Sequence, residues 1–441
     1  MEYDIVLINA TFSNSTFNRR LCFPLGILYL GAILMARGYK VTLLDYNLIP
    51  KDFNEIEKDI QQIKTPIFAI TSLSSGYSFV KRITSIIRRN LPKSKIILGG
   101  AITFGVPEFI LQNVGVDMLV EGEAESCIID LVEAILGNKE INISGVYTFL
   151  NNEIKRQLYP QDLIMDISTL PFPAWSLLDV EQYIQKSLHA WHSDGMRTFP
   201  ILASRGCPFN CNFCSKTLGS KVRVRKDDTI EEIEMAIKQY HINDVWFLDE
   251  EFALSEKRVM EMCQMMGSLS KRISFICSMR VDCVSPTILQ SMKEAGCRRI
   301  VYGVESGSQT ILDNMNKRIT VAQASNAIIE TRKWGIEAYV NFMFNYPGET
   351  ESTLRETISF MKQHRLYSTF SFTTPLPGTE LFDYAISNGK IINLDSYLES
   401  LQNRLTTELV LNLTDLPTKR LLELREIAKR ELFPHRIILK D

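Results

Sequence analysis

Three cysteines, Cys207, Cys211 and Cys214, are the side chains of this 441-residue sequence whose type and spacing most directly indicate chemistry. They lie within one short loop that is rich in Gly, Pro and Asn, so their thiolates can converge on one compact centre. Iron–sulfur clusters are held by Cys thiolates, as a rule four to a cluster. Three local cysteines without a nearby fourth would leave one iron of a [4Fe-4S] cluster open to another ligand.

A zinc site and a set of core residues are the competing interpretations of these cysteines. Structural zinc is closed by four Cys or His ligands, and the nearest histidines, His189 and His192, have a spacing that fits no common zinc-finger pattern. Core cysteines would lie on an apolar face rather than in this polar loop. The other six cysteines are scattered and are expected to pack as small buried hydrophobes: Cys22, Cys127, Cys263, Cys277, Cys283 and Cys297.

Composition and charge are those of a globular protein and argue against nucleic-acid-binding, membrane-spanning and secreted classes. Hydrophobic residues make up 45% and charged residues 23% of the chain, which is ordinary for a globular protein. A net charge of −2 argues against nucleic-acid binding, and no apolar run reaches the roughly 18 residues that a membrane span needs. The nine cysteines, an odd number at irregular spacings, do not suggest a disulfide framework, and the first residues do not resemble a signal peptide. We therefore expect a cytoplasmic protein.

Strand and helix patterns alternate over residues 1–148, which predicts an α/β domain with a doubly wound, Rossmann-like parallel sheet. The predicted strands cover residues 4–9, 40–44, 67–72, 95–98 and 117–120. Ligands bind at the carboxyl ends of such strands. Small and turn-forming residues lie there: Ala10, Thr11, Ser72, Ser74, Gly76, Gly99, Gly100, Gly122 and Glu123. The alternative is that these glycines only turn the chain.

Residues 149–196 contain two closely spaced prolines, Pro171 and Pro173, which forbid a continuous helix, and are predicted to form an ordered linker. Residues 197–380 show a second strand–helix series. Its predicted strands cover residues 199–204, 244–248, 273–279, 298–303, 336–344 and 369–373. This series favours a partial (β/α)6 barrel of the TIM type, with its chemistry at the carboxyl ends of the strands. Residues 381–441 are expected to form a small helical C-terminal extension.

The cysteine loop, placed after the first barrel strand, resembles the radical SAM superfamily, whose hallmark is the pattern CxxxCxxC with an aromatic residue before the third Cys. Phe213 fills that position. The resemblance implies a [4Fe-4S] cluster on Cys207, Cys211 and Cys214, with S-adenosylmethionine (SAM) bound to the open iron. It also implies reductive cleavage of SAM to a 5′-deoxyadenosyl radical that removes hydrogen from the substrate.

Motifs at the ends of the later barrel strands extend this resemblance. Residues 247–252 hold three acids flanked by Phe, and residues 278–282, 303–308, 345–350 and 375–379 resemble further rim loops of the family in order. A solvated acidic loop is the alternative for the first of them. By the resemblance, SAM contacts the following residues: Phe213, Asp249, Glu250, Ser278, Arg280, Glu305, Ser306 and Pro347.

The order of the two domains resembles the cobalamin-binding subgroup, which includes class B methyltransferases and the anaerobic magnesium-protoporphyrin ester cyclase. Residues 24–30, 98–100 and 120–123 and the linker stretch 170–179 carry this resemblance, which covers nearly the whole chain. It implies that cobalamin binds at the strand ends of the domain of residues 1–148, on the small and turn-forming residues from Ala10 to Glu123 listed for that domain. One departure is that no histidine precedes His189, so this domain has no imidazole to offer cobalt. A structural domain without cobalamin is the alternative.

A cobalamin-dependent radical SAM methyltransferase is the leading functional interpretation, with methylcobalamin supplying the methyl group to an unactivated carbon or phosphorus centre. The alternatives are a cobalamin-dependent cyclase, oxidase or rearrangement enzyme, and a non-catalytic iron–sulfur sensor. The substrate is expected to be a small molecule, a lipid or a peptide. An external electron donor such as flavodoxin or ferredoxin is expected to reduce the cluster.

Overall fold

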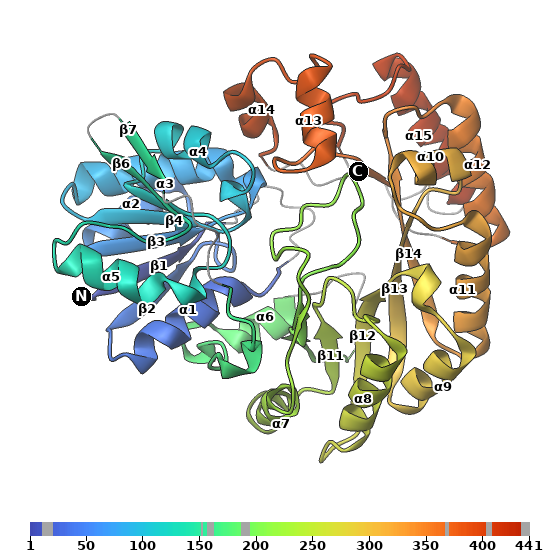
Figure 1. The fold of residues 1–441 in the computed structure, drawn as a ribbon, viewed down its shortest axis with the longest axis horizontal. Coiled ribbons are helices and arrows are strands. Elements are labelled where there is room, and N and C mark those ends of the chain that lie inside the picture. Colours follow the sequence, from blue (N-terminus) through green and yellow to red (C-terminus); the bar gives the residue numbers. More distant parts are fainter. Residues whose placement is uncertain are drawn as a thin grey trace. The chain divides into compact units, whose positions relative to one another are not determined.

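The chain forms two compact units in a computed structural model (Figure 1). Unit 1 comprises Met1–Asp194 and Asn393–Arg404, and unit 2 comprises Gly195–Ile392 and Leu405–Asp441. The structure describes residues 1–10, 21–150, 153–156, 163–186, 195–366, 370–402 and 408–433. The predicted site residue Thr11 and the histidines His189 and His192 lie outside the described residues.

Unit 1 is built on a seven-stranded sheet with the order β2-β1-β3-β4-β5-β6-β7. Its parallel part contains β1 (Ile5–Asn9), β2 (Val41–Asp45), β3 (Ile67–Thr71), β4 (Lys95–Gly99) and β5 (Met118–Val120). The chain moves from β1 to one side for β2 and to the other side for β3. Ligands of doubly wound sheets bind at such a switch point, outside the carboxyl ends of the strands. The predicted doubly wound sheet is confirmed.

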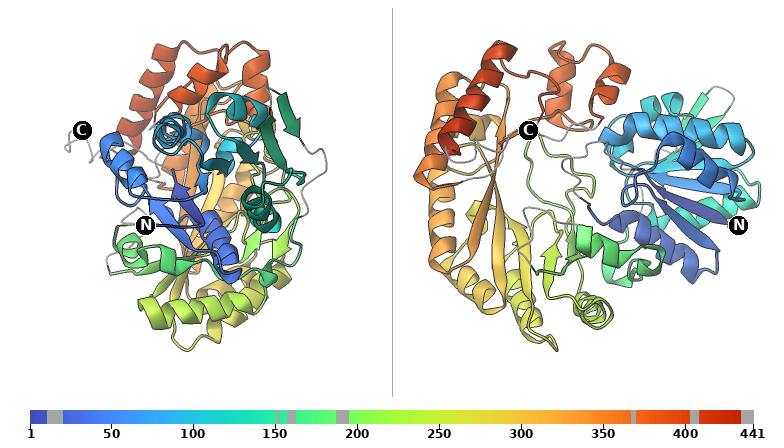
Figure 2. Two further views of the ribbon diagram at one scale, coloured as in Figure 1. Left: turned by 90° about the vertical axis from the view of Figure 1, so that its left-hand side faces the viewer. Right: turned by 180° about the vertical axis from the view of Figure 1, so that it is seen from behind.

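Helices cover both faces of this sheet (Figure 2). α1 (Leu25–Ala36) and α5 (Ile128–Leu136) share a hydrophobic core with alternate strand residues such as Leu7 and Ile97. The residues of opposite orientation, such as Val6 and Ile96, are also fully buried. The other helices of the series are α2 (Phe53–Gln61), α3 (Tyr77–Asn90) and α4 (Pro107–Asn113). Burial on both faces explains why these strands appear in the sequence as continuous apolar runs.

Two antiparallel strands, β6 (Val146–Leu150) and β7 (Glu153–Arg156), extend one edge of the sheet and were not predicted. The side chains of Glu153, Lys155 and Arg156 are exposed. Since β7 buries no apolar face, its sequence carries no alternating pattern, and only its pairing with β6 defines it as a strand.

The predicted linker is ordered in its described part and packs on unit 1. The backbone NH of Ala174 donates to the carbonyl of Leu28 at 3.0 Å. In α6 (Val180–Lys186), the buried Tyr183 donates its hydroxyl to Asp45 at 2.6 Å. Part of the C-terminal extension, α14 (Leu394–Ser400), also belongs to unit 1.

Unit 2 is built on a six-stranded sheet with the order β15-β14-β13-β12-β11-β8, which is the order of the sequence. Its strands are parallel: β8 (Thr198–Ile201), β11 (Asp244–Phe247), β12 (Ser274–Met279), β13 (Cys297–Glu305), β14 (Glu337–Phe344) and β15 (Phe370–Phe372). Consecutive strands pair without closing a ring, so the predicted partial barrel is confirmed. All six carboxyl ends meet at one rim.

Helices follow the outer side of this curved sheet (Figure 1). They are α7 (Asp228–Tyr240), α8 (Glu256–Gly267), α9 (Pro286–Glu294), α10 (Gln309–Asn314), α11 (Val321–Lys333) and α12 (Glu351–Gln363). Two later helices, α13 (Glu380–Ser387) and α15 (Thr418–Leu432), belong to the C-terminal extension. α15 packs on α12, where Arg420 forms an ion pair with Glu351 at 2.6 Å.

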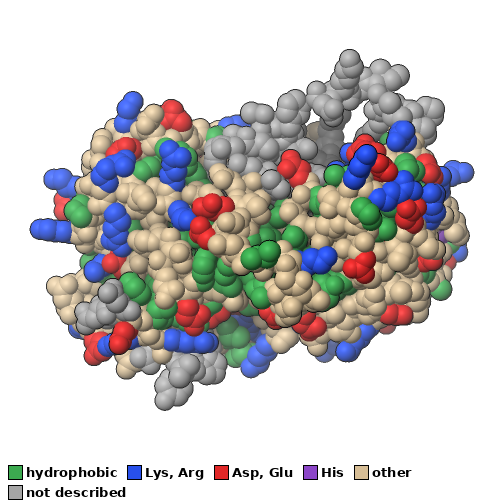
Figure 3. Space-filling model, turned by 90° about the horizontal axis from the view of Figure 1, so that it is seen from above, with side chains coloured by type: hydrophobic (Ala, Val, Ile, Leu, Met, Phe, Trp, Pro, Cys, Tyr) green, Lys and Arg blue, Asp and Glu red, His purple; other side chains and the backbone are tan. Residues whose placement is uncertain are grey.

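The surface carries charges of both signs. On the face drawn in Figure 3, Lys and Arg side chains are interspersed with Asp and Glu. Among the described helices, none combines the length and the apolar character needed to cross a bilayer.

Candidate functional site

The cysteine loop begins at the carboxyl end of the first barrel strand. A short antiparallel ladder of β9 (Ser204–Arg205) and β10 (Arg223–Val224) closes its base. Gly206 starts the loop with a φ of +89°, and a Cβ added there would lie 2.4 Å from the carbonyl oxygen of Lys221. The NH of Cys207 then donates to the carbonyl of Gly219 at 3.2 Å. The loop therefore requires glycine at its first position.

The three thiols share one electrostatic environment. Burial raises the pKa of Cys207, and burial together with the charges of Cys211 and Cys207 raises the pKa of Cys214 to about 11. Binding of a metal would remove the protons of Cys207 and Cys214, because a coordinating thiol is deprotonated by its metal. This donor set fits an iron–sulfur cluster, in which each cysteine binds an iron as thiolate.

Zinc fits this donor set less well, because structural zinc is closed by four Cys or His ligands and the loop supplies three cysteines. In the part of the chain that the structure describes, no group of three His, Cys, Asp or Glu side chains is arranged to hold a metal ion.

The acidic motif after β11 contains two acids with hydrogen bonds that support the loops, Asp249 and Glu251, and the charges of Glu251 and Glu250 both reach Cys207. Asp249 is buried, and its oxygens accept from the NH of Ala203 at 2.8 Å and the hydroxyl of Ser204 at 2.5 Å. Burial raises its pKa to about 6. Asp249 therefore supports the strand end that precedes the cysteine loop.

Glu251 joins the ends of two neighbouring strands. Its carboxylate accepts from the NH of Ala253 and from the NH of Arg280, both at 3.0 Å, and burial raises its pKa to about 7. The charge of Glu250 contributes to the raised pKa values of Cys207 and Cys214. Of the two acids predicted to contact SAM, Glu250 is thus placed near the cysteines and Asp249 is engaged behind their loop.

Arg280 packs directly on the cysteine loop. Its guanidinium lies 3.9 Å from the ring centroid of Phe209. It also forms two 2.9 Å hydrogen bonds with Asp282 and donates to the carbonyl of Lys317 at 2.9 Å. These contacts make Arg280 an organiser of the loop. Ser278 lies near the end of β12, just before Arg280, and is half-buried. Its carbonyl accepts from the NH of Phe252 at 3.0 Å.

Glu305 ends β13 in a strained conformation. Its φ is +74°, which is uncommon for a residue other than glycine and is often found at functional sites. Its buried carboxylate accepts from Lys317 Nζ at 3.4 Å. The next residue, Ser306, shares a 3.0 Å hydrogen bond with the hydroxyl of Thr357 on α12. Pro347 follows β14, and its carbonyl accepts from Asn314 at 3.4 Å.

Sequence reasoning missed Lys317 and Glu349. Lys317 is buried, with its ammonium 5.7 Å from the ring centroid of Phe213. It follows α10 rather than a strand, so no strand-end motif contains it. Glu349 lies in the rim motif of residues 345–350, but the sequence pattern does not indicate a role for it. It accepts from the NH of Asn345 at 2.6 Å, and burial raises its pKa to about 8.

In unit 1, the structure brings the predicted residues of β1 and β3 together at the switch point. The hydroxyl of Ser72 donates to the carbonyl of Ala10 at 2.9 Å. A Cβ at Gly76 would lie 2.1 Å from Ser72 Oγ and 2.7 Å from the carbonyl oxygen of Ala10, so this close approach requires glycine. Ser74 donates to the carbonyl of Ala101, beside the β4 loop, at 3.5 Å.

The other predicted residues of unit 1 end the next two strands. Gly99 ends β4 and Gly100 follows it, and Gly122 and the buried Glu123 follow β5. These residues therefore lie along the same sheet edge as Ala10 and Ser72. A sheet edge with tight glycine turns permits a ligand to approach the backbone closely.

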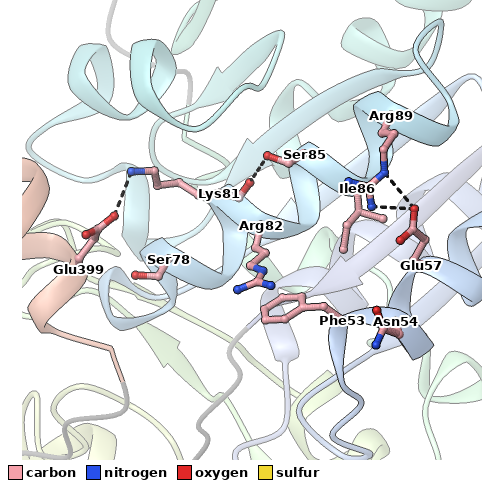
Figure 4. A pocket seen from close by; sticks show the side chains of 10 residues that line it. All are labelled: Phe53, Asn54, Glu57, Ser78, Lys81, Arg82, Ser85, Ile86, Arg89 and Glu399. Atoms are coloured by element: carbon pink, nitrogen blue, oxygen red, sulfur yellow. Dashed lines mark hydrogen bonds and ion pairs between the residues drawn. The ribbon is translucent and has the colours of Figure 1, made fainter.

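A separate groove of about 500 Å³ runs along α2, α3 and α14 and contains none of the predicted residues (Figure 4). Its cations already have partners. Lys81 pairs with Glu399 at 3.1 Å, and Arg89 pairs with Glu57 at 2.7 Å. Arg82 lies 4.3 Å from the ring centroid of Phe53.

Two family models match the chain. The model of the Radical SAM superfamily matches residues 201–361, and that of the B12 binding domain matches residues 19–132. An uncharacterized methyltransferase of Pyrococcus horikoshii is 30% identical over 378 residues, which cover 84% of this chain and 80% of that protein. The anaerobic magnesium-protoporphyrin IX monomethyl ester cyclase of Cereibacter sphaeroides is 26% identical, over 85% of this chain and 62% of its own length.

Solved structures agree on the fold. The radical SAM methyltransferase TsrM from Kitasatospora setae, with cobalamin and a [4Fe-4S] cluster bound, superposes with a TM-score of 0.73. It is 18% identical, over 89% of this chain and 79% of that chain. The cobalamin-dependent radical enzyme OxsB has a TM-score of 0.70 and 20% identity, over 88% of this chain and 56% of that chain. The predicted resemblance is confirmed, and with it the cofactors: cluster, SAM and cobalamin.

Proposed function

Because this chain belongs to the radical SAM superfamily and carries a B12 binding domain, we propose that it is a methyltransferase acting on an unactivated carbon or phosphorus centre. The observation that carries the proposal is the pairing of a three-cysteine loop on a partial barrel with a cobalamin-type sheet. The relative from Pyrococcus horikoshii, which is named a methyltransferase, aligns over both parts. When bound, the cluster and SAM supply a hydrogen-abstracting radical, and cobalamin supplies a methyl carrier.

The chain's own residues hold and orient these groups. Cys207, Cys211 and Cys214 would bind the cluster. Of the two acids predicted to contact SAM, Glu250 has the better support as a contact for its amino group, because the charge of Glu250 and not that of Asp249 acts on Cys207 and Cys214. A carboxylate there suits a cationic amino group and would repel a carboxylate.

The remaining proposed SAM contacts come from the surrounding loops. Phe213 lies in the cysteine loop, Ser278 lies near the end of β12, and Pro347 follows β14. We assign Asp249, Arg280, Glu305 and Ser306 to the same site. Their hydrogen bonds to other protein groups support a role in holding the SAM-binding loops.

In unit 1, the edge formed by Ala10, Ser72, Ser74 and Gly76 would hold the tail of cobalamin at the switch point, with Gly99, Gly100, Gly122 and Glu123 beside it. Thr11 is kept in this set from the sequence alone. With no histidine before His189, this domain would offer cobalt no imidazole.

Anaerobic reconstitution with iron, sulfide and hydroxocobalamin tests the proposal. We expect spectra of both cofactors, formation of 5′-deoxyadenosine after reduction, and transfer of label from methyl-labelled SAM to cobalamin. The variant C211A should lose the cluster and 5′-deoxyadenosine but keep cobalamin. A fully loaded cluster on a protein that never binds cobalamin would overturn the proposal.

A cobalamin-dependent cyclase, oxidase or rearrangement enzyme is the second candidate, favoured by the similarity to the cyclase of Cereibacter sphaeroides. Such an enzyme would form 5′-deoxyadenosine yet leave the methyl label of SAM out of the product. An iron–sulfur sensor would bind a cluster without cleaving SAM at all.

We further propose a cytoplasmic enzyme that receives electrons from a flavodoxin or ferredoxin and acts on a small molecule, a lipid or a peptide. All nine cysteines lie among the described residues and none forms a disulfide, which supports a reducing compartment. Reduction of the cluster by purified flavodoxin, compared with a chemical reductant, tests the donor.

A further inference from the structure

Residues 314–317, at the end of α10 and the start of its connection to α11, hold the cysteine loop on both sides of its middle cysteine. The NH of Asn212 donates to the carbonyl of Met315 at 3.1 Å, and its side chain donates to the carbonyl of Asn314, also at 3.1 Å. The side chain of Asn316 donates to the carbonyl of Asn210 at 2.7 Å. Asn210 and Asn212 are the two neighbours of Cys211, so these bonds bracket it.

The same segment turns sharply and buries a cation. Asn316 and Arg318 both have left-handed backbones, with φ of 50° and 54°, and Asn tolerates this region better than most residues. Lys317 between them is only 7% exposed. Its ammonium lies 3.4 Å from Glu305 Oε1 and 5.7 Å from the ring centroid of Phe213, the residue before Cys214. Its carbonyl accepts from Arg280, which stacks on Phe209.

We propose that residues 314–317 are a clamp that positions the cluster-binding loop, and that Lys317 is the fixed positive charge that tunes the cluster. The proposal rests on the cluster that the family implies and not on methyl transfer. It assigns positioning roles to Asn316 and Lys317, which strand-end motifs do not contain.

The two parts of the clamp have separable consequences. The Asn316 bond restrains the backbone at Cys211, so its loss should loosen the cluster. A buried cation favours the reduced cluster, because reduction adds negative charge in a region of low dielectric. Removal of the Lys317 charge should therefore shift the midpoint potential to more negative values. The charge of Lys317 also acts on Cys214, which places that cysteine within its electrostatic reach.

Asn316→Asp and Asn316→Gly test the positioning part. Aspartate keeps the size but replaces the donor, and glycine keeps the left-handed backbone without adding charge. The matched control is Asn388→Asp, since Asn388 makes the same type of bond to the carbonyl of Tyr384 at 2.9 Å at the end of α13. After anaerobic reconstitution, both Asn316 variants should lose iron to a chelator several-fold faster than the control. Equal rates in all three variants would overturn the clamp.

Lys317→Met and Lys317→Arg test the electrostatic part by a reductive titration followed by electron paramagnetic resonance. K317M should shift the midpoint potential negatively, and K317R should stay near wild type. Because K317M leaves Glu305 buried without its cation, the double variant E305Q/K317M is measured beside it. The single variant E305Q is measured as well, because it differs from the double variant only in the charge of Lys317. Equal potentials in these two variants at full cluster occupancy would overturn this role. The titration uses neither cobalamin nor substrate, so failure of the proposed methyl transfer would not affect it.

Discussion

The hydroxyl of Tyr77, at the start of α3, donates a 2.5 Å hydrogen bond to Asp395, 318 residues later in the sequence. Lys81, one turn further along α3, pairs with the same carboxylate at 3.0 Å and with Glu399 at 3.1 Å. The partners lie on α14, whose Leu398 is buried. This C-terminal helix therefore forms part of unit 1, next to the η1 turn (Ser74–Gly76) that carries two predicted cobalamin contacts.

Replacing Asp395 with Asn should destabilise unit 1 by about 1 kcal/mol, because a charge-assisted hydrogen bond and a part-exposed ion pair are lost. Its hydrogen bond with Tyr77 lowers the pKa of Asp395. The stabilisation is therefore present above the unfolded pKa near 3.8 and is lost as the pH falls through the lower folded value. Urea unfolding at pH 7 and pH 3 checks this, with the exposed Asp130 of unit 1 changed to Asn as the control.

In the apo protein, the free energy of unfolding should fall as the pH rises from 4 to about 6, because of the buried carboxyl of Asp249. Burial raises its pKa from 3.8 to about 6, so the folded state holds a proton that the unfolded state has released. The sign is opposite to that for Asp395, and the effect is about 3 kcal/mol, since one pKa unit is about 1.4 kcal/mol. D249N can keep both contacts without charge and should flatten the dependence. Thermal unfolding across this range measures it, and an equal slope in wild type and D249N would contradict it.

Gly206→Ala should prevent the cysteine loop from closing. The added Cβ meets the Lys221 carbonyl oxygen at 2.4 Å, and that backbone atom is fixed by the β9–β10 ladder. We expect the iron content after reconstitution to fall by more than half. Gly219→Ala is the matched control, because Gly219 also has a positive φ, +75°, but its Cβ would meet nothing within 4 Å. Similar iron contents in the two variants would mean that backbone strain alone, and not the close approach, governs the loop.

Gly76→Ala should weaken cobalamin binding and leave the cluster intact. Its Cβ would lie 2.1 Å from Ser72 Oγ and would separate the ends of β1 and β3. Gly26→Ala in α1 is the control, since nothing lies within 4 Å of its Cβ and alanine favours a helix by about 0.5–1 kcal/mol. Equilibrium dialysis with hydroxocobalamin and the iron content are measured on each variant. If G76A binds as much cobalamin as G26A, the switch point is not part of the cobalamin site.

The sequence by itself determined the features that depend on neighbouring residues. Three cysteines in one short loop can reach one cluster in almost any fold, and the apolar runs of β1 and β3 predict strands because both faces of a parallel sheet are buried. The sequence also predicts that the motifs at the strand ends lie together, since parallel strands bring their carboxyl ends to one edge.

Only the tertiary structure decided which acids of these motifs support the loops and which act on the cysteines through their charge. Asp249 and Glu250 are adjacent in sequence, yet Asp249 supports the strand behind the loop and Glu250 acts on the thiols. The roles of Lys317 and Asp395 depend on contacts between segments far apart in the chain, which have no local pattern. β7 is likewise defined by its partner strand. Long-range pairing is chosen by the packing of the whole chain, and that choice leaves no periodic mark in the sequence.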